Sequence, residues 1–213
     1  DGSINESHTL KSGDICINGM FLNYASFFGI PEYKLESVVD FLINHQMSDG
    51  GFNCMSTRSG AIHSSMHTTI SVLEGIWEFM KAGYTYRLEE LERIKKESEE
   101  FILCHKLFKS DKTDEVIDKR WIMLSFPSRL RYDILRALLY FADSGHPYDP
   151  RMEDAIHIIV SKRRKTGRWP VQAKHTGEVH FDMEPTGEDS RWNTLRALRV
   201  LNEYKPSEFK DIE

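Results

Sequence analysis

The chain has 213 residues, of which 40% are hydrophobic, and 28 Lys and Arg stand against 33 Asp and Glu, a formal net charge of −5 at pH 7. These values are typical of a globular protein with a sizeable core, and the acidic balance argues against a nucleic-acid partner. No apolar run approaches the ~20 residues of a membrane helix, so no membrane span is predicted. Three cysteines are too few for a disulfide framework, which favours a reducing, cytoplasmic location.

Apolar residues recur at three- and four-residue steps along most of the chain. This spacing, with Gly and Pro as stop signals, predicts helices over residues 15–28, 35–46, 65–81, 89–106, 130–142, 151–162 and 191–204. Residues 1–12 lack a pattern and are predicted to be a disordered N-terminal segment, and residues 206–213 a C-terminal tail. No segment shows sustained two-residue alternation, so the predicted class is all-α.

The predicted helices repeat with a period near 60 residues. A Leu-charged-small triplet recurs at steps of 62 and 60, in Leu73-Glu74-Gly75, Leu135-Arg136-Ala137 and Leu195-Arg196-Ala197. Helices that are apolar on most sides alternate with helices that have a single apolar stripe. This alternation predicts an inner ring and an outer ring of stacked helical hairpins. The small third residue of each triplet would let helices approach closely. By the same alignment Thr69, Arg131 and Arg191 are equivalent, and Gly51-Phe52 and Arg168-Trp169 occupy the same place after the helices that end near Gln46 and Arg163.

The stretch from Gln46 to Gly75 carries a family resemblance. Gln46-x-x-Asp49-Gly50-Gly51-Phe52 resembles the Gln-x-x-x-Gly-x-Trp/Phe repeat motif of squalene cyclases and protein prenyltransferases, and the helix led by His67-Thr68-Thr69 is similar to one in prenyltransferase β-subunits. The resemblance implies an α/α toroid, here over residues 13–205. The predicted helices are fewer than a complete ring of this family has. A partial or open ring, or a ring surface completed by a homo-oligomer or a partner chain, is therefore expected.

In such a toroid the inner helices begin at one rim, so residues near their starts converge on the mouth of a central cavity. The resemblance implies a zinc site there, because prenyltransferase β-subunits bind zinc through an Asp-x-Cys and a His on successive inner helices. The matching residues are Asp14, Cys16 and His67. A rival ligand set is Cys54, His63 and His67. The alternative to both is that Cys16 and His67 are packing residues.

The same rim is predicted to hold an anion site. Arg129, Arg131 and Arg191 lie near the starts of inner helices, and guanidinium groups beside helix N-termini suit a diphosphate. His63 and Trp192 are further candidate ligand-binding residues, and aromatic side chains would suit an isoprenoid tail. The alternative is that these arginines form structural ion pairs with carboxylates such as Asp182, Glu184 and Asp189.

The candidate catalytic carboxylates are Asp133, on an apolar inner helix, and Asp182, in a loop at the rim. The Asp-x-Asp-Asp motif of squalene cyclases and the Asp-rich magnesium motif of terpene synthases are absent. The leading hypothesis is a prenyltransferase-like or terpene-cyclase-like protein that binds an isoprenoid diphosphate. A non-catalytic toroid that serves as a binding module, and a glycoside-active (α/α) barrel that uses paired carboxylates, are the alternatives.

Overall fold

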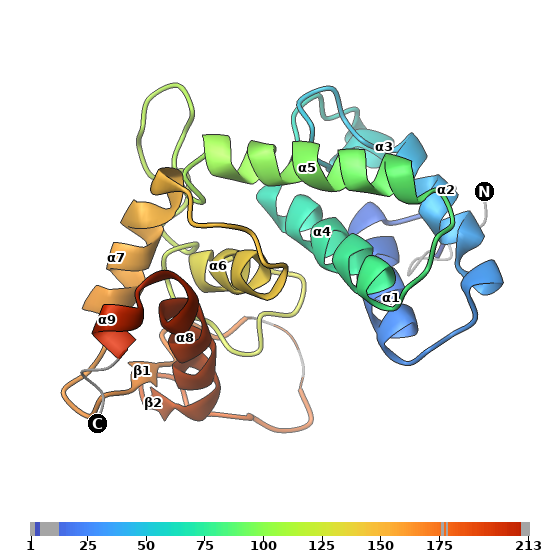
Figure 1. Cartoon of the computed structure of the whole chain (residues 1–213). Coiled ribbons are helices and arrows are strands. Elements are labelled where there is room, and N and C mark those ends of the chain that lie inside the picture. The colour runs from blue at the N-terminus through green and yellow to red at the C-terminus, as the bar shows by residue number, and fades with distance from the viewer. Residues whose placement is uncertain (1–2, 5–12, 176, 178, 210–213) are drawn as a thin grey trace. The chain divides into compact units, whose positions relative to one another are not determined.

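A computed structural model describes residues 3–4, 13–175, 177 and 179–209. The described chain is mostly helical, as predicted, and it divides into two compact units, Asp1–Ile102 and Leu103–Glu213 (Figure 1). In the part of the chain that the structure describes, every helix falls short of the length and apolar character that crossing a bilayer requires.

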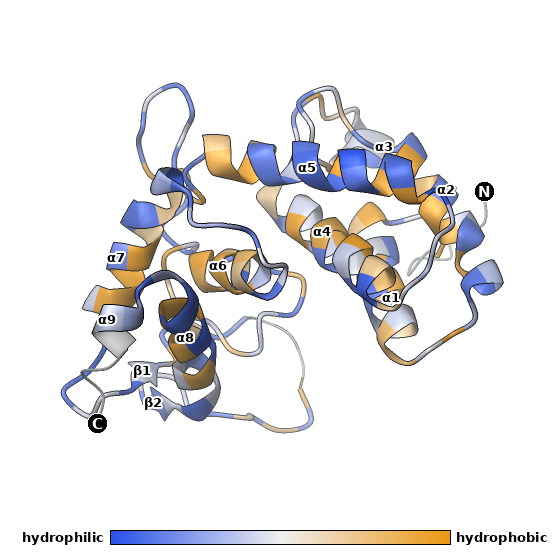
Figure 2. Ribbon diagram, viewed as in Figure 1, coloured by the Kyte–Doolittle hydropathy of each residue, from blue (hydrophilic) through white to orange (hydrophobic). Residues whose placement is uncertain are grey.

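The first unit contains six helical segments. They are α1 (Ile15–Phe27), the 3-10 helix η1 (Glu32–Lys34), α2 (Glu36–Asn44), the short α3 (Met55–Ser59), α4 (Met66–Lys81) and α5 (Leu88–Cys104), which crosses the boundary between the units. The bounds of the four long helices agree with the periodicity to within about two residues. Their apolar faces enclose a core in which Leu22, Leu42, Phe52, Ile76 and Leu91 are fully buried. Figure 2 shows hydrophilic patches alternating with hydrophobic ones along α5.

Helices α1 and α4 pack closely because a glycine of one faces the backbone of the other. A Cβ atom on Gly75 would lie 2.3 Å from the carbonyl oxygen of Gly19, and one on Gly19 would lie 2.7 Å from the carbonyl oxygen of Ser71. No real Cβ atom tolerates such distances from a backbone atom. The prediction that the small residue at position 75 permits a close helix approach is therefore confirmed.

The second unit begins with a long loop and continues with helices around a two-stranded ribbon. Its elements are α6 (Ile134–Asp143), η2 (Pro150–Met152), α7 (Glu153–Ser161), β1 (Trp169–Pro170), β2 (Asp189–Ser190), α8 (Arg191–Tyr204) and α9 (Pro206–Phe209). Strands β1 and β2 are antiparallel, with Trp169 opposite Ser190. Helix α6 packs against both α7 and α8. These two-residue strands are too short for an alternating pattern to reveal them.

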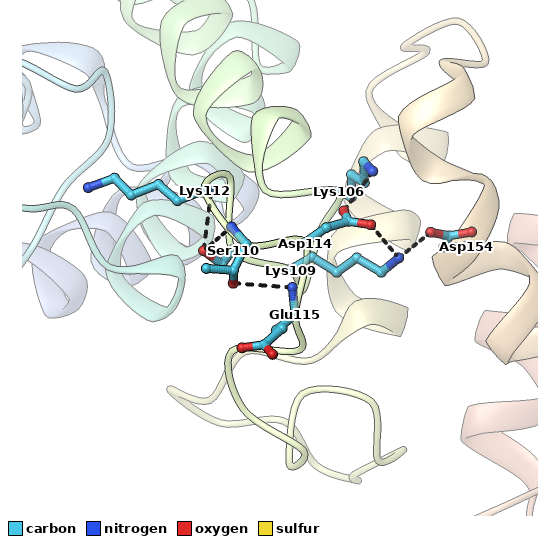
Figure 3. Close-up of polar contacts among 8 residues, drawn as sticks. Lys106, Lys109, Ser110, Lys112, Asp114, Glu115 and Asp154 are labelled. Atoms are coloured by element: carbon cyan, nitrogen blue, oxygen red, sulfur yellow. Dashed lines mark hydrogen bonds and ion pairs between the residues drawn. The ribbon is translucent and has the colours of Figure 1, made fainter.

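Ion pairs connect helix α7 with the loop that precedes α6 (Figure 3). The Nζ atom of Lys109 lies 2.6 Å from a carboxylate oxygen of Asp154 in α7 and 3.5 Å from one of Asp114. Lys106 contacts Asp114 as well, at 2.6 Å. All these groups are at least partly exposed, so each pair contributes little, about 0–1 kcal/mol. They add to the buried apolar side chains of this loop, among them Leu107, Leu124 and Tyr132.

The glycine-rich turn after α2 has a defined hydrogen-bond pattern. The backbone N–H of Met47 donates to the carbonyl oxygen of Gly51 at 2.9 Å, and that of Gly50 donates back to Met47 at 3.0 Å. Gly50 has φ = +90°, a conformation that favours glycine. The next aromatic residue, Phe52, donates its N–H to Oγ1 of Thr69, in α4, at 3.0 Å.

The turn after α7 repeats this pattern with different residues. Arg164 donates its N–H to the carbonyl oxygen of Arg168 at 2.8 Å, and Gly167 donates back to Arg164 at 2.9 Å. Gly167 has φ = +78°. Trp169 then donates its N–H to Oγ1 of Thr194, in α8, at 3.0 Å. Gly51-Phe52 and Arg168-Trp169 therefore occupy equivalent places in their units, as the sequence spacing predicted.

The starts of the helices differ from the sequence alignment in one respect. Helix α6 begins at Ile134, not at residue 130, because Asp133 is its N-cap and accepts a hydrogen bond from the N–H of Arg136. The small residues of the three triplets therefore lie at different distances from the start of their helices. Gly75 lies nine residues after the first residue of α4, Ala137 three after that of α6, and Ala197 six after that of α8. Thr69, Arg131 and Arg191, which the alignment made equivalent, do not share a helix position.

Two predictions concern the chain termini. Most of the N-terminal segment 1–12 lies outside the described residues, but Ile4 exchanges two hydrogen bonds with the side chain of Asn18, each of 2.9 Å. In the predicted C-terminal tail, Pro206–Phe209 forms the short helix α9, and residues 210–213 lie outside the described part.

Candidate functional site

A pocket of about 300 Å³ lies in the second unit and collects several of the predicted rim residues. Its wall comes from the loop before α6 and the loop between β1 and β2. The lining residues are Phe126, Pro127, Arg129, Lys174, His175, Val179, His180, Phe181, Asp182, Met183 and Glu184. Two of the predicted residues, Arg129 and Asp182, thus share one pocket.

The carboxylates of this pocket already have partners. Asp182 forms an ion pair with Lys174. Glu184 is buried, and its carboxylate accepts hydrogen bonds from Oγ of Ser190 and from the N–H of Arg191, at the start of α8. Glu184 therefore completes the N-terminus of α8, where a negative charge is favoured by the helix dipole.

The three arginines of the predicted anion site differ in exposure and in their ion-pair partners. Arg191 is 81% exposed, and its Nε atom lies 3.8 Å from Glu184, which is a weak contact. Within the described residues, no carboxylate pairs with Arg129 or Arg131, so the expected structural ion pairs of these two with Asp182, Glu184 or Asp189 are not formed. Arg129 and Arg131 supply backbone carbonyl oxygens to the guanidinium of Arg136, at 3.3 and 2.9 Å.

His175 is the group in this pocket that sequence reasoning missed. Its Nε2 atom is buried and has no hydrogen-bond partner among the described residues. Burial, followed by the positive charge of Arg131, lowers the pKa of His175 below its usual value, with a further contribution from Arg129, while Asp133 acts in the opposite direction. The imidazole is therefore neutral at pH 7. No sequence signal singles it out, because it stands in an irregular loop without a motif.

Asp133, a predicted catalytic residue, has two hydrogen-bond partners at the start of α6. It is buried, with 1% of its surface exposed. One carboxylate oxygen accepts the N–H of Arg136 and the other accepts the hydroxyl of Ser125, both at 2.8 Å. Asp133 does not line the pocket, and these contacts use both oxygens. The prediction that Asp133 lies inside its helix is wrong, because its side chain caps that helix from outside.

Trp192 is not part of the pocket wall, but it contacts an aromatic residue that is. Its ring stacks on that of Phe126, with centroids 5.5 Å apart and planes 11° apart. Trp192 is 43% exposed, and Phe181, on the pocket wall, is 72% exposed. Exposed apolar side chains around a pocket that also contains a few charged groups are typical of ligand sites.

The predicted metal ligands all lie in the first unit. Asp14 is buried before α1 and forms an ion pair with Arg58 of α3. Cys16, in the first turn of α1, contacts Cys54. His67 is in the first turn of α4, whereas His63 precedes that helix and is exposed, so the two histidines of the rival set do not share a helix face.

Among the residues that the structure describes, no three His, Cys, Asp or Glu side chains assemble into a group that could hold a metal ion. Asp14 is paired with Arg58. The sulfur atom that contacts Cys16 is that of Cys54, which belongs to the rival ligand set. Zinc binding by Asp14, Cys16 and His67 therefore stays a prediction, and no chemical step is derived from it.

Comparisons with known proteins do not assign a family. No family model matches the chain, no curated protein matches it, and no solved structure matches it.

Proposed function

We propose that the protein binds a small ligand with an anionic head and an apolar tail, of the isoprenoid diphosphate class, in the pocket of the second unit. One observation carries this proposal. Arg129 stands on the pocket wall without a carboxylate partner in the described chain, next to the buried and unpartnered Nε2 of His175.

The charges around the pocket favour an anion. Lys174 and Asp182 neutralise each other, and Glu184 is bound by hydroxyl and amide donors at α8. Glu184 remains an anion, but both of its oxygens are occupied by these donors. The positive charge without a carboxylate partner among the described residues is the guanidinium of Arg129, and that of Arg131 is close enough to lower the pKa of His175. A guanidinium can donate two parallel hydrogen bonds to a phosphate, which makes arginine well suited to this ligand class.

The rest of the wall favours an apolar tail. Phe126, Val179, Phe181 and Met183 line the pocket, and Trp192 extends this surface by stacking on Phe126. A volume of about 300 Å³ is at the small end of the range for ligand pockets. The pocket would thus accept the head group and the first part of the tail, with the remainder lying along the exposed aromatic side chains.

The function hypotheses differ in the fate of the bound ligand. A prenyltransferase-like or terpene-cyclase-like enzyme would convert the bound diphosphate, whereas a binding module would release it unchanged. The glycoside-active alternative has less support, because it requires two reactive carboxylates and Asp133 is occupied as a helix cap. Incubation with farnesyl diphosphate, both alone and with a cysteine-containing acceptor peptide, followed by chromatography for released diphosphate, separates the first two.

The binding experiment uses the full chain and three probes: farnesyl diphosphate, farnesol and inorganic pyrophosphate. A ligand that binds only the folded state raises the melting temperature by mass action, and farnesyl diphosphate should raise it most. Arg129→Gln should remove most of that rise. Arg120→Gln is the matched control, because Arg120 is exposed and already paired with Asp118. If no diphosphate shifts the melting temperature at millimolar concentration, the proposal fails.

We also propose that the helices form an α/α toroid, as a partial or open ring of hairpin repeats. The recurring turn after α2 and α7, with the same donors and acceptors, supports this proposal. Small-angle X-ray scattering of the full chain tests it. A profile that requires two independently moving units would contradict a continuous array of hairpins.

A further inference from the structure

Two cysteines of the first unit lie against each other although they are 38 positions apart. Cys16 stands in the first turn of α1, and Cys54 is the N-cap residue of α3. The backbone N–H of Cys16 donates to Sγ of Cys54 at 3.1 Å, and Oγ1 of Thr68 donates to the same sulfur at 3.6 Å.

Two donors thus converge on the sulfur atom of Cys54. A neutral thiol is a weak acceptor, whereas a thiolate accepts strongly from a backbone N–H and from a hydroxyl. The N–H of Cys16 belongs to the first turn of α1, where it has no partner within that helix. The geometry therefore favours the thiolate form at Cys54, and Cys16 is the thiol beside it.

The charged and titratable neighbours on the surrounding elements do not change this assignment. Asp14, which precedes α1, and Arg58, in α3, form an ion pair with each other. His67 is the titratable residue beside Thr68 in α4, and it is half-buried. Both cysteines are also half-buried rather than sealed in the core, so a small reagent can approach them.

We propose that Cys16 and Cys54 are a redox-active dithiol, in which Cys54 is the nucleophile, Cys16 is the resolving thiol, and a small disulfide of the glutathione type is the oxidant. The site needs no metal and no residue of the second unit. It is independent of the ligand pocket proposed above.

The reaction balances in two exchange steps. The thiolate of Cys54 attacks one sulfur of oxidised glutathione, which forms a mixed disulfide and releases one glutathione thiolate. The released glutathione thiolate then takes the proton of Cys16, which leaves Cys16 as a thiolate. Cys16 then attacks Sγ of Cys54 and expels the second glutathione. The protein has lost two electrons and two thiol groups, and oxidised glutathione has gained the electrons.

Cys104 is the third cysteine of the chain, and its substitution gives the protein in which only the pair can react. It is exposed, it belongs to the second unit, and its sulfur lies 3.8 Å from a guanidinium nitrogen of Arg151. All measurements are therefore made on the full chain with Cys104→Ser, purified in the presence of a chelator. The double variants add Cys16→Ser or Cys54→Ser to that background.

The first experiment equilibrates each variant in glutathione redox buffers, alkylates the remaining thiols and measures the intact mass. The Cys104→Ser protein should change from two alkylated thiols to none, with the loss of two hydrogen atoms and no bound glutathione. With Cys16→Ser added, the reaction should stop at one bound glutathione. With Cys54→Ser added, Cys16 should react at least tenfold more slowly. Two thiols that stay alkylatable in the most oxidising buffer would overturn the proposal.

The second experiment needs no cysteine substitution within the pair. Iodoacetamide labelling of the Cys104→Ser protein over a pH series, read by peptide mass, should modify Cys54 before Cys16, with a midpoint below that of an ordinary thiol because two donors favour the Cys54 thiolate. An ordinary thiol has its midpoint near pH 8.5. Adding Thr68→Val removes one donor and should move the midpoint upward. A midpoint near 8.5 in the unaltered pair, or preferential labelling of Cys16, would overturn the assignment.

Discussion

Gly75 of α4 faces the backbone of Gly19 in α1, so closely that a Cβ atom at position 75 would lie 2.3 Å from the carbonyl oxygen of Gly19. Two effects of Gly75→Ala oppose each other. Alanine favours a helix over glycine by about 1 kcal/mol, whereas overpacking against rigid backbone costs about 1–3 kcal/mol or more. We expect the clash to dominate and the free energy of unfolding to fall.

Urea unfolding of Gly75→Ala measures the sign of this change. Gly19→Ala should be destabilised as well, because its Cβ atom would meet the backbone of Ser71 and Val72. An increase in stability for either variant would mean that the two helices are not in contact at these residues.

The recurring turn predicts a matched pair of destabilised variants. Thr69→Val and Thr194→Val each keep the side-chain shape but remove the acceptor for a backbone N–H, that of Phe52 or of Trp169. Leaving a buried donor unsatisfied costs about 1–3 kcal/mol. Thr113→Val, in an exposed loop, is the control and should change stability by less than about 0.5 kcal/mol. Thermal unfolding of the three variants is the measurement. Losses no larger than that of the control would contradict the assigned hydrogen bonds.

Substitution should distinguish the contributions of the two predicted catalytic carboxylates, Asp133 and Asp182, to stability. Asp133→Ala removes the cap of α6 and leaves the hydroxyl of Ser125 unpaired, so we expect a loss of at least about 1 kcal/mol. Asp182→Ala removes only an exposed ion pair with Lys174 and should cost less than about 1 kcal/mol. Denaturant melts compare the two. Asp133→Asn keeps an oxygen for the cap, and a turnover assay of this variant tests whether the carboxylate has a chemical role.

His175 should make stability and ligand binding depend on pH. Its pKa is lower in the folded protein than the ordinary value near 6.5, so the unfolded chain binds the proton more readily. The stabilising contribution is fully present above pH 6.5 and is lost as the pH falls below it. Proton NMR of the imidazole should report the lowered pKa, and Arg131→Gln should raise it. Arg120→Gln, elsewhere in the loop and already paired with Asp118, should leave it unchanged.

The same histidine gives a signature of anion binding. A diphosphate in the pocket would raise the pKa of His175, so binding should take up a proton and strengthen as the pH falls from about 7.5 toward 6. Calorimetry in buffers of different ionisation enthalpy measures that uptake. His175→Asn corrects for protonation of the diphosphate itself. Equal proton uptake by the variant and the original chain would exclude His175 from the site.

Zinc binding is tested directly by elemental analysis of protein purified without a His tag. The predicted site implies about one zinc per chain, lost with Cys16→Ser and with His67→Ala but kept with Cys54→Ser. Because Cys16 and Cys54 are in contact, loss with both cysteine variants would indicate that metal binds at the dithiol. Absence of zinc from zinc-supplemented preparations would leave Asp14 and His67 as structural residues.

Local patterns along the chain were enough to predict the helices and one of their close contacts. Spacing of apolar residues predicted α1, α2, α4, α5, α7 and α8 to within about two residues, because a helix face repeats every 3.6 residues whatever it packs against. The recurrence of Gly51-Phe52 as Arg168-Trp169 could be predicted for a similar reason, since a glycine with positive φ and a following buried aromatic residue are local requirements.

The partners of the candidate site residues depend on the three-dimensional structure. Asp133 could be a helix residue or a cap, and the choice depends on Ser125, whose position no local pattern reveals. Cys54 lies beside Cys16, and His175 joins Arg129 in the pocket, because separate segments fold together there. Contacts between segments distant in the chain arise from packing, and packing leaves no periodic signal in a single sequence.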